Sequence, residues 1–265
     1  MISTRRVAIV TGSSRGIGLN YQSSACRAQE VVDEIAALST THIAGKPQDR
    51  VRAFAFKADI GRLNEGQKLL DETITAFGRL DIVVLNAAWM MAQTIHELTE
   101  DSYLEAFNTS VKGPLFFFKN AQPYLAQSQA DQKHLIPVHE RGSPVGGSRI
   151  ITISTSLTTL SMVGEDHLTY CATKGALGQI TRVLAKDKVF GAKGITINTI
   201  APGAIDTEGF RRGKEDDVID FFKAAHPEGR LGQPDDISGV VSFLASGNSK
   251  WVNGQTIRVN GALGV

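Results

Sequence analysis

The feature that most constrains the fold of this chain is a regular alternation of short β-branched runs with longer helical patterns. We expect strands at residues 7–10, 51–57, 80–85, 149–153, 194–200 and 255–259. We expect helices at residues 63–77, 97–107, 111–125, 167–190 and 235–245, and an irregular stretch at 127–148. Strands that alternate with helices form parallel βαβ units. The sequence therefore predicts an α/β fold, a doubly wound and mostly parallel sheet, in one domain over residues 1–265.

Composition excludes several functional classes. The 28 basic and 27 acidic residues leave a net charge of +1, which predicts neither a nucleic-acid partner nor a membrane-surface partner. The N-terminal residues have no apolar signal core. Two cysteines, Cys26 and Cys171, are too few to staple a domain of this size, so we expect reduced thiols in a cytoplasmic protein. The six histidines lack ligand spacing, and no metal site is predicted.

A glycine-rich segment, TGSSRGIG at residues 11–18, follows the first expected strand directly. Glycines permit a tight turn and let the backbone approach a pyrophosphate, and a following helix N-terminus offers free N–H groups to the anion. The alternative is a simple strand-to-helix turn, but the position after the first strand favours a dinucleotide site. The candidate cofactor-binding residues here are Gly12, Ser14, Arg15, Gly16, Ile17 and Gly18.

Tyr170 and Lys174 lie four residues apart in a helical pattern and therefore share one helix face. A free phenol has a pKa of about 10, and a nearby ammonium lowers that pKa. Such a tyrosine can exchange a proton with a carbonyl or alcohol oxygen while hydride moves to or from a nicotinamide. An exposed helix face is the alternative interpretation of this spacing. A cluster of hydroxyl residues at 154–156 ends the preceding strand. Because ligands bind at such strand ends, this cluster favours a catalytic role for Tyr170 and Lys174.

Taken together, these residues resemble the short-chain dehydrogenase/reductase family, including its ketoreductase members. Residues 11–18 match its TGxxxGxG motif, and residues 85–88 (LNAA) stand where the family has NNAG. Residues 170–174 match YxxxK, and residues 198–203 match NxxxPG. The resemblance implies a seven-stranded Rossmann sheet, an NAD(P) cofactor, a small-molecule carbonyl or alcohol substrate, and a homodimer or homotetramer.

The resemblance also assigns roles to individual residues. It implies that Tyr170 is the acid/base and that Lys174 tunes Tyr170 and holds the nicotinamide ribose. Asp59, with Ile60 beside it, stands where the family contacts adenine. The further cofactor-binding residues that it implies are Asn86, Ala87, Pro202, Gly203, Ile205 and Thr207.

Two positions depart from the family pattern. Strict register places Thr155 where the family has its catalytic serine, but Ser156 is the next hydroxyl, and either could orient the substrate carbonyl. Where the family has an asparagine that relays protons, register places Ser110, and Asn108 lies two residues earlier. We interpret Asn108 as a turn or capping residue. The choice between Thr155 and Ser156, and the replacement for the asparagine, stay open at this stage.

The largest departure follows the glycine segment. Residues 20–24 (NYQSS) resemble the end of the second strand in NADP-preferring members, and residues 25–38 resemble the helix after it. The first connecting helix and most of the second strand are absent from the sequence. We therefore expect six strands rather than seven, a glycine loop that feeds directly into a helix at roughly 19–38, and residues 20–24 on or beside its first turn. Weak NADP(H) binding is the expected consequence.

The leading hypothesis is an NADP(H)-dependent oxidoreductase, with NAD as the alternative cofactor, that interconverts a ketone or aldehyde and an alcohol. A second hypothesis is a cofactor-impaired relative with a binding or structural role, which the missing segment motivates. A third is a non-redox enzyme on the same fold, against which the Tyr170–Lys174 pair argues. Residues 204–226 are the expected substrate lid.

Overall fold

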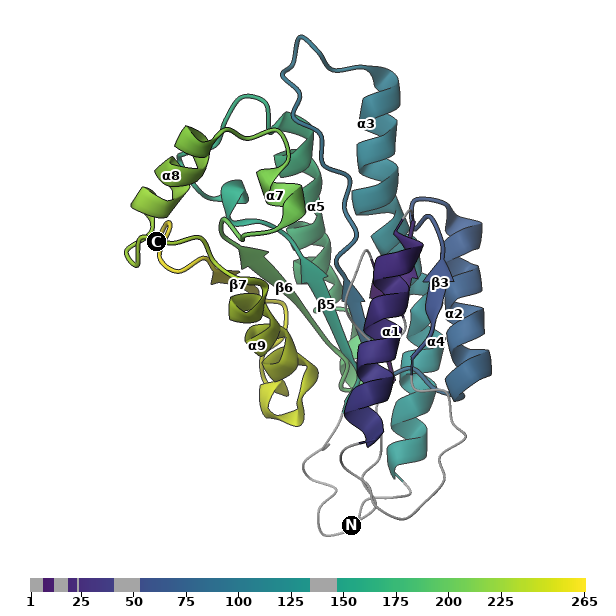
Figure 1. Ribbon diagram of the computed structural model, residues 1–265. Helices are drawn as coiled ribbons and strands as arrows, with labels where there is room; N and C mark the ends of the chain where they lie inside the picture. Colours follow the sequence, from purple (N-terminus) through teal and green to yellow (C-terminus); the bar gives the residue numbers. More distant parts are fainter. Residues whose placement is uncertain (1–6, 12–18, 23, 41–52, 134–146) are drawn as a thin grey trace.

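The computed structural model describes residues 7–11, 19–22, 24–40, 53–133 and 147–265 (Figure 1). Its centre is a parallel sheet with the strand order β3-β2-β1-β4-β5-β6-β7. The strands are β1 (Ala8–Thr11), β2 (Leu19–Tyr21), β3 (Ala55–Lys57), β4 (Ile82–Leu85), β5 (Arg149–Ile153), β6 (Thr196–Pro202) and β7 (Thr256–Val259). The predicted doubly wound α/β architecture is thus confirmed.

Helices cover both faces of the sheet. Figure 1 shows α1 and α9 on one face and α2, α4 and α5 on the other. The helices are α1 (Ala25–Thr40), α2 (Leu63–Phe77), α3 (Glu100–Phe107), α4 (Gly113–Lys133), α5 (Leu168–Leu184), α6 (Lys188–Ala192), α7 (Glu208–Arg211), α8 (Asp216–Ala225) and α9 (Pro234–Ala245). No helix among the described residues is both long and apolar enough to cross a membrane.

Alternating side chains of the central strands supply two separate cores. In β4, Val83 and Leu85 pack with the apolar residues of α2 and α4, whereas Val84 faces α9 and packs with Leu244. β5 divides in the same way, with Ile150 in the first core and Ile151 in the second. This period of two is what a strand buried on both faces requires. Because β4, β5 and β6 are parallel, their carboxyl ends lie at one edge of the sheet.

The expected six-stranded sheet is wrong, because β2 is present as a seventh strand of three residues. Leu19 pairs with Val10 of β1, and β2 pairs with β3 from Leu19 to Tyr21. Residues 20 and 21 therefore lie in a strand and not on a helical turn, and the helix begins only at Ala25. The Asn20 side chain donates to the Ala58 carbonyl at 2.8 Å, which ties β2 to the end of β3.

Other expected boundaries were shifted. The third strand is shorter than the expected 51–57, and residues 51 and 52 lie outside the described residues. The expected irregular stretch at 127–148 begins as helix, because α4 continues to Lys133. The expected helix at 167–190 is divided into α5 and α6. Asp187 starts the second helix by accepting hydrogen bonds from the backbone N–H groups of Val189 and Phe190, at 2.7 and 3.2 Å.

Candidate active site

A cavity of about 640 Å³ opens at the carboxyl ends of the central strands. Its floor is built by residues that follow or end β4, β5 and β6, among them Asn86, Thr155 and Pro202. Its outer wall comes from the segment around α7 and α8, with Phe210, Lys214 and Phe222. The floor is the place where open parallel sheets bind their ligands. The outer wall belongs to the segment that the sequence predicted as a lid.

Tyr170 and Lys174 both line this cavity from one face of α5, as predicted. Lys174 is only 3% exposed, and its Nζ donates to the Ile153 carbonyl at 2.5 Å. Burial lowers the pKa of Lys174 to about 8, because a charged ammonium loses hydration there. The ammonium still holds its proton at neutral pH, and it uses one of its three donors on Ile153.

The pKa of Tyr170 differs from the expectation that Lys174 lowers it. Burial of the phenol raises this pKa, and a side-chain hydrogen bond with Thr155 lowers it to a lesser extent. The Lys174 ammonium is directed at the Ile153 carbonyl instead. Tyr170 is therefore a protonated donor at neutral pH in this structure, which suits an acid rather than a base.

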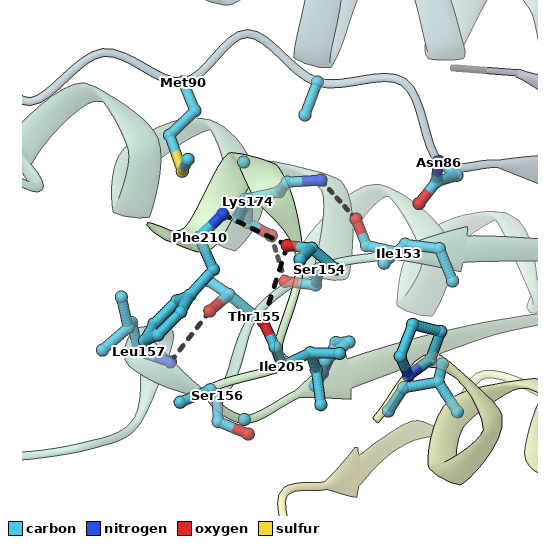
Figure 2. Close-up of a pocket in the computed structure, with 18 of the residues that line it drawn as sticks. Asn86, Met90, Ile153, Ser154, Thr155, Ser156, Leu157, Lys174, Ile205 and Phe210 are labelled. Atoms are coloured by element: carbon cyan, nitrogen blue, oxygen red, sulfur yellow. Dashed lines mark hydrogen bonds between the residues drawn. The ribbon is translucent and has the colours of Figure 1, made fainter. Parts of the chain in front are cut away.

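The three hydroxyls that follow β5 have different partners, and this separates Thr155 from Ser156. Ser154 donates to the Lys174 carbonyl at 3.0 Å, and Ser156 donates to the Ala201 carbonyl at 2.8 Å. In Figure 2 the Ser156 hydroxyl points away from Lys174. The Thr155 hydroxyl accepts a hydrogen bond from the Leu157 N–H at 3.3 Å, and its interaction with the Tyr170 phenol lowers the pKa of that phenol. Thr155 is therefore the better candidate for the partner of Tyr170, whereas the Ser156 hydroxyl is engaged by β6.

The segment after β6 lines the cavity through all four residues that the resemblance had assigned there, Pro202, Gly203, Ile205 and Thr207. At Gly203 a Cβ would lie 2.9 Å from the Cα of Asn260, so this close approach requires glycine. Thr207 caps α7 by accepting a hydrogen bond from the Phe210 N–H at 3.1 Å.

The segment after β4 is held by Thr11, the last residue of β1. The Thr11 hydroxyl accepts hydrogen bonds from the N–H groups of Asn86 and Ala87, at 3.1 and 3.2 Å. Asn86 and Ala88 line the cavity, whereas Ala87 packs against the apolar core. The LNAA motif, which was expected to contact the cofactor, thus also connects the end of β4 to the end of β1.

The structure describes only part of the region where the adenine of a cofactor was predicted to bind. The Asp59 carboxylate accepts from the Gly61 N–H at 2.9 Å and lies 3.3 Å from the Arg62 Nε. The Ile60 side chain is buried in the core at 4% exposure, so that side chain has a packing role. The glycine-segment residues Gly12, Ser14, Arg15, Gly16, Ile17 and Gly18 lie outside the described residues.

Ser110 lies in a π-helical turn, Asn108–Lys112, that joins α3 to α4. Its buried hydroxyl accepts a hydrogen bond from the Trp89 N–H at 3.2 Å. The carbonyl of Asn108 accepts from the Gly113 N–H that closes the turn, which agrees with a turn role for Asn108. Sequence reasoning missed this turn, although π-helical turns often accompany functional sites.

Several cavity residues were not among the predicted site residues. Met90, which the sequence suggested only as a wall residue, is half exposed and reaches over the cavity (Figure 2). Further examples are Leu157, Leu160, His167, Phe210, Lys214, Phe222 and Leu263. Phe210, Lys214 and Phe222 lie in the segment that the sequence predicted as a lid, and His167 had a signal of its own, since it precedes Tyr170 by less than one helical turn. Within the described residues there is no cluster of three or more potential metal ligands.

The donor set fits a nicotinamide dinucleotide. Lys174 is a buried ammonium with two donors left for hydroxyl groups such as those of a ribose. Gly203 brings the backbone close to the cavity, and Asn86 and Thr207 add polar groups at its edge. Such a site can place a carbonyl carbon between a hydride donor and the Tyr170 phenol.

Comparison with known proteins identifies relatives along nearly the whole chain. A family model described as Enoyl-(Acyl carrier protein) reductase matches residues 24–263. The hydroxynaphthalene reductase-like protein Arp2 of Metarhizium robertsii is 34% identical, over 97% of this chain and 94% of its own length. A protein of Zymoseptoria tritici named "Probable tetrahydroxynaphthalene reductase" is 32% identical over the same shares.

A solved structure agrees with these relatives. The short-chain dehydrogenase of Burkholderia cenocepacia, in complex with NADP, superposes with a TM-score of 0.79 at 27% identity and covers 97% of both chains. The alignments with the two fungal relatives run over 285 and 283 positions, more than the 265 residues present here. The relatives therefore carry residues that have no counterpart in this chain.

Proposed function

This chain belongs to the short-chain dehydrogenase/reductase family, and from that premise we propose that it is an NADP(H)-dependent oxidoreductase. Its reaction interconverts a ketone or aldehyde and the corresponding alcohol. The observation that carries the proposal is the convergence of Tyr170, Lys174 and Thr155 in one cavity at the carboxyl ends of β4, β5 and β6.

In this proposal Tyr170 donates its proton to the carbonyl oxygen of the substrate. Its raised pKa keeps the phenol protonated at neutral pH, so that the donor is in the correct state before the reaction. The Thr155 hydroxyl donates a second hydrogen bond to the same oxygen and stabilises the charge that develops there. A bound nicotinamide supplies the hydride to the carbonyl carbon.

Lys174 has two roles in this proposal. Lys174 lies one helical turn from Tyr170, and in this proposal its positive charge stabilises the phenolate that remains after proton transfer. Its free donors hold the ribose hydroxyls of the cofactor. Because Ile153 accepts one hydrogen bond from Nζ, the ammonium is oriented before any ligand binds.

We also propose NADP(H) rather than NAD(H) as the cofactor. Asn20 of the NYQSS segment donates to the Ala58 carbonyl, and Gln22 and Ser24, exposed polar residues in the described part of the segment, are candidates to hold a 2′-phosphate. The B. cenocepacia structure contains NADP, which agrees with this choice. Pro202, Gly203, Ile205, Thr207 and Asn86 complete the proposed nicotinamide side.

A homodimer or homotetramer in the cytoplasm is part of the same proposal. The support is an apolar surface beside α9, where Trp251 is 95% exposed and Phe243 is 42% exposed. Exposed large apolar side chains of this kind favour burial against another subunit. Light scattering of the purified protein tests the assembly, and Trp251→Ser should shift it toward the monomer.

The decisive test of the activity is an assay with NADPH and a panel of aryl and alkyl ketones. Loss of nicotinamide absorbance that depends on ketone, and that Tyr170→Phe abolishes, supports the proposal. Binding of neither NADPH nor NADH in a fluorescence titration would contradict it and would favour a cofactor-impaired relative. Cofactor binding without turnover of any ketone or alcohol would favour a non-redox reaction.

A further inference from the structure

The cavity holds two ionisable side chains that the proposed reaction does not use, His167 and Lys214. Much of the remaining wall is apolar and includes Met90, Leu157, Leu160, Phe210, Phe222 and Leu263. A polar group on an apolar wall commonly determines which ligand binds and in which orientation. These two side chains are therefore the candidates for substrate recognition beyond the carbonyl itself.

His167 is held in place on three sides. Its Nδ1 lies 2.7 Å from Oδ1 of Asp166, and its backbone N–H donates to the Gly164 carbonyl at 3.1 Å. The Asp166 carbonyl accepts from the Gln93 N–H at 2.8 Å, in a parallel bridge that joins residue 93 to His167. The ring also packs edge-on against Tyr170, with 6.4 Å between centroids. His167 is thus oriented beside the proposed proton donor.

The contact with Asp166 decides what His167 can offer to a ligand. A carboxylate accepts the proton on Nδ1, and in the neutral ring this leaves Nε2 as a hydrogen-bond acceptor. Among the described residues, no hydrogen bond is formed by Nε2. The acceptor therefore suits a hydroxyl group of the substrate.

Lys214 is the weaker candidate. Its Nζ lies 4.8 Å from the centroid of the Phe210 ring, so the ammonium already has a cation–π partner. It also belongs to the segment between α7 and α8, whereas His167 precedes the helix that carries Tyr170. The distance from His167 to the reacting carbonyl is thus better defined than that from Lys214.

We propose that His167, oriented by Asp166, determines substrate specificity by accepting a hydrogen bond from a hydroxyl group of the substrate. The enzyme then prefers apolar ketones that carry a hydroxyl group over the same ketones without it. The inference rests on the proposed function, since the carbonyl must be held by Tyr170. A site built to bind a hydroxyl rejects the analogue that lacks it, because its own polar group is left unpaired. Because His167 is half-buried, we expect a preference of roughly tenfold.

The test compares kcat/KM for α-tetralone with that for each of its ring-hydroxylated derivatives, with NADPH as reductant. We expect the wild-type protein to prefer at least one hydroxylated derivative, and His167→Phe to reduce that ratio to about one. His167→Gln retains an acceptor and should restore part of the preference. The matched control is His96→Phe, an exposed histidine outside the cavity, which should leave the ratio unchanged.

Two further measurements make the outcome decisive. Lys214→Met should keep the preference, and its loss in Lys214→Met but not in His167→Phe would overturn the proposal. Equilibrium binding of naphthol and naphthalene, followed by their own fluorescence, reports recognition without turnover. If no ketone is reduced but naphthol binding still depends on His167, the proposed function fails, and with it the role of His167 in substrate specificity, while hydroxyl binding by His167 is supported. If α-tetralone is reduced without any hydroxyl preference, this inference alone fails.

Discussion

The two halves of the sheet differ in how firmly their strands are joined. β5 pairs with β6 along its whole length, from Arg149 opposite Thr196 to Ile153 opposite Ile200. β2, in contrast, pairs with β1 at one position among the described residues, where Leu19 meets Val10. The half from β4 to β7 carries the proposed catalytic residues, and the half from β1 to β3 is where the adenosine end of the cofactor is expected. The chemistry is thus built on the extensively paired half.

The connection between β1 and β2 explains this difference. Only residues 12–18 join the two strands, whereas a helical crossover needs a dozen or more residues. The cavity extends over Val10 and Val84 to Ile237 and Val241 of α9, on the face that such a helix would cover. The sheet thus keeps its strand order although only seven residues join β1 to β2.

The largest effect is expected in the firmly paired half. Tyr170→Phe removes only the proton donor, so kcat/KM should fall by about 100- to 10,000-fold while NADPH affinity is retained. Steady-state kinetics and a fluorescence titration of NADPH measure the two quantities. Retention of more than about a tenth of wild-type kcat/KM would be inconsistent with a general acid at this position.

Thr155 and Ser156, both in the half from β4 to β7, should respond differently to the loss of their hydroxyl groups. Thr155→Val removes the donor beside Tyr170 and should lower kcat by roughly 100- to 1,000-fold. Ser156→Ala leaves the buried Ala201 carbonyl without its donor and should cost about 1–3 kcal/mol of stability, with little effect on kcat. Kinetics and chemical unfolding of both variants test this division. Equal small effects on kcat would show that neither hydroxyl is positioned for substrate.

For the half from β1 to β3, the prediction concerns insertion of the missing segment and not removal of a side chain. Inserting a family-like helix and strand segment between β1 and β2 should cover the apolar face and tighten NADPH binding by about tenfold or more, which corresponds to about 1.4 kcal/mol. Isothermal titration and thermal unfolding provide the measurements. The matched control is a glycine–serine insertion of the same length, which should do neither. Tight NADPH binding by the unmodified chain, with no gain on insertion, would contradict the expectation.

The pH dependence should report on Lys174. Its pKa of about 8 predicts that kcat/KM for ketone reduction is constant below that pH and falls above it, by up to about tenfold per pH unit. A pH profile of kcat/KM with saturating NADPH tests this. A profile that stays flat to pH 10 or so would show that the ammonium is not required.

Lys174 should also make stability depend on pH, and stability should rise over the pH range in which activity falls. The folded pKa of Lys174 lies below the unfolded value of about 10.4, so the folded protein binds fewer protons between the two values. Unfolding free energy should therefore rise with pH across that window, by up to about 3 kcal/mol, as the buried charge is relieved. Urea unfolding of wild type against Lys174→Met measures it, since the variant should lack the rise.

The smallest effect concerns an ion pair that links the two halves. The Arg27 guanidinium of α1 lies 2.5 Å from the Glu208 carboxylate of α7 and holds the pKa of that carboxyl below its usual range. Both side chains are more than half exposed, so solvent screens the pair and its coupling should be small and weaken with salt. A double-mutant cycle with Arg27→Gln and Glu208→Gln measures the coupling. A coupling that salt does not reduce would be evidence against this interpretation.

Much of the fold follows from local signals in the sequence. The helix at 63–77 and the strand at 149–153 have the predicted boundaries. Gly78, with a φ of 73°, explains where that helix ends, because glycine adopts this left-handed conformation without strain. The Tyr170–Lys174 pair is equally local, since a spacing of four residues on any regular helix places both side chains on one face.

Other features required the tertiary structure, because they depend on neighbours distant in the chain. The presence of β2 depends on pairing with β1 and β3, which compensates for a strand too short to predict. Which hydroxyl faces Tyr170 depends on Ser156 finding an acceptor in β6. The direction of the Tyr170 pKa shift depends on burial by surrounding segments. Sequence by itself thus determined the order of elements and the placing of Tyr170 and Lys174 on one helix face, whereas long-range packing decided the number of strands, the partner of Ser156 and the direction of the Tyr170 pKa shift.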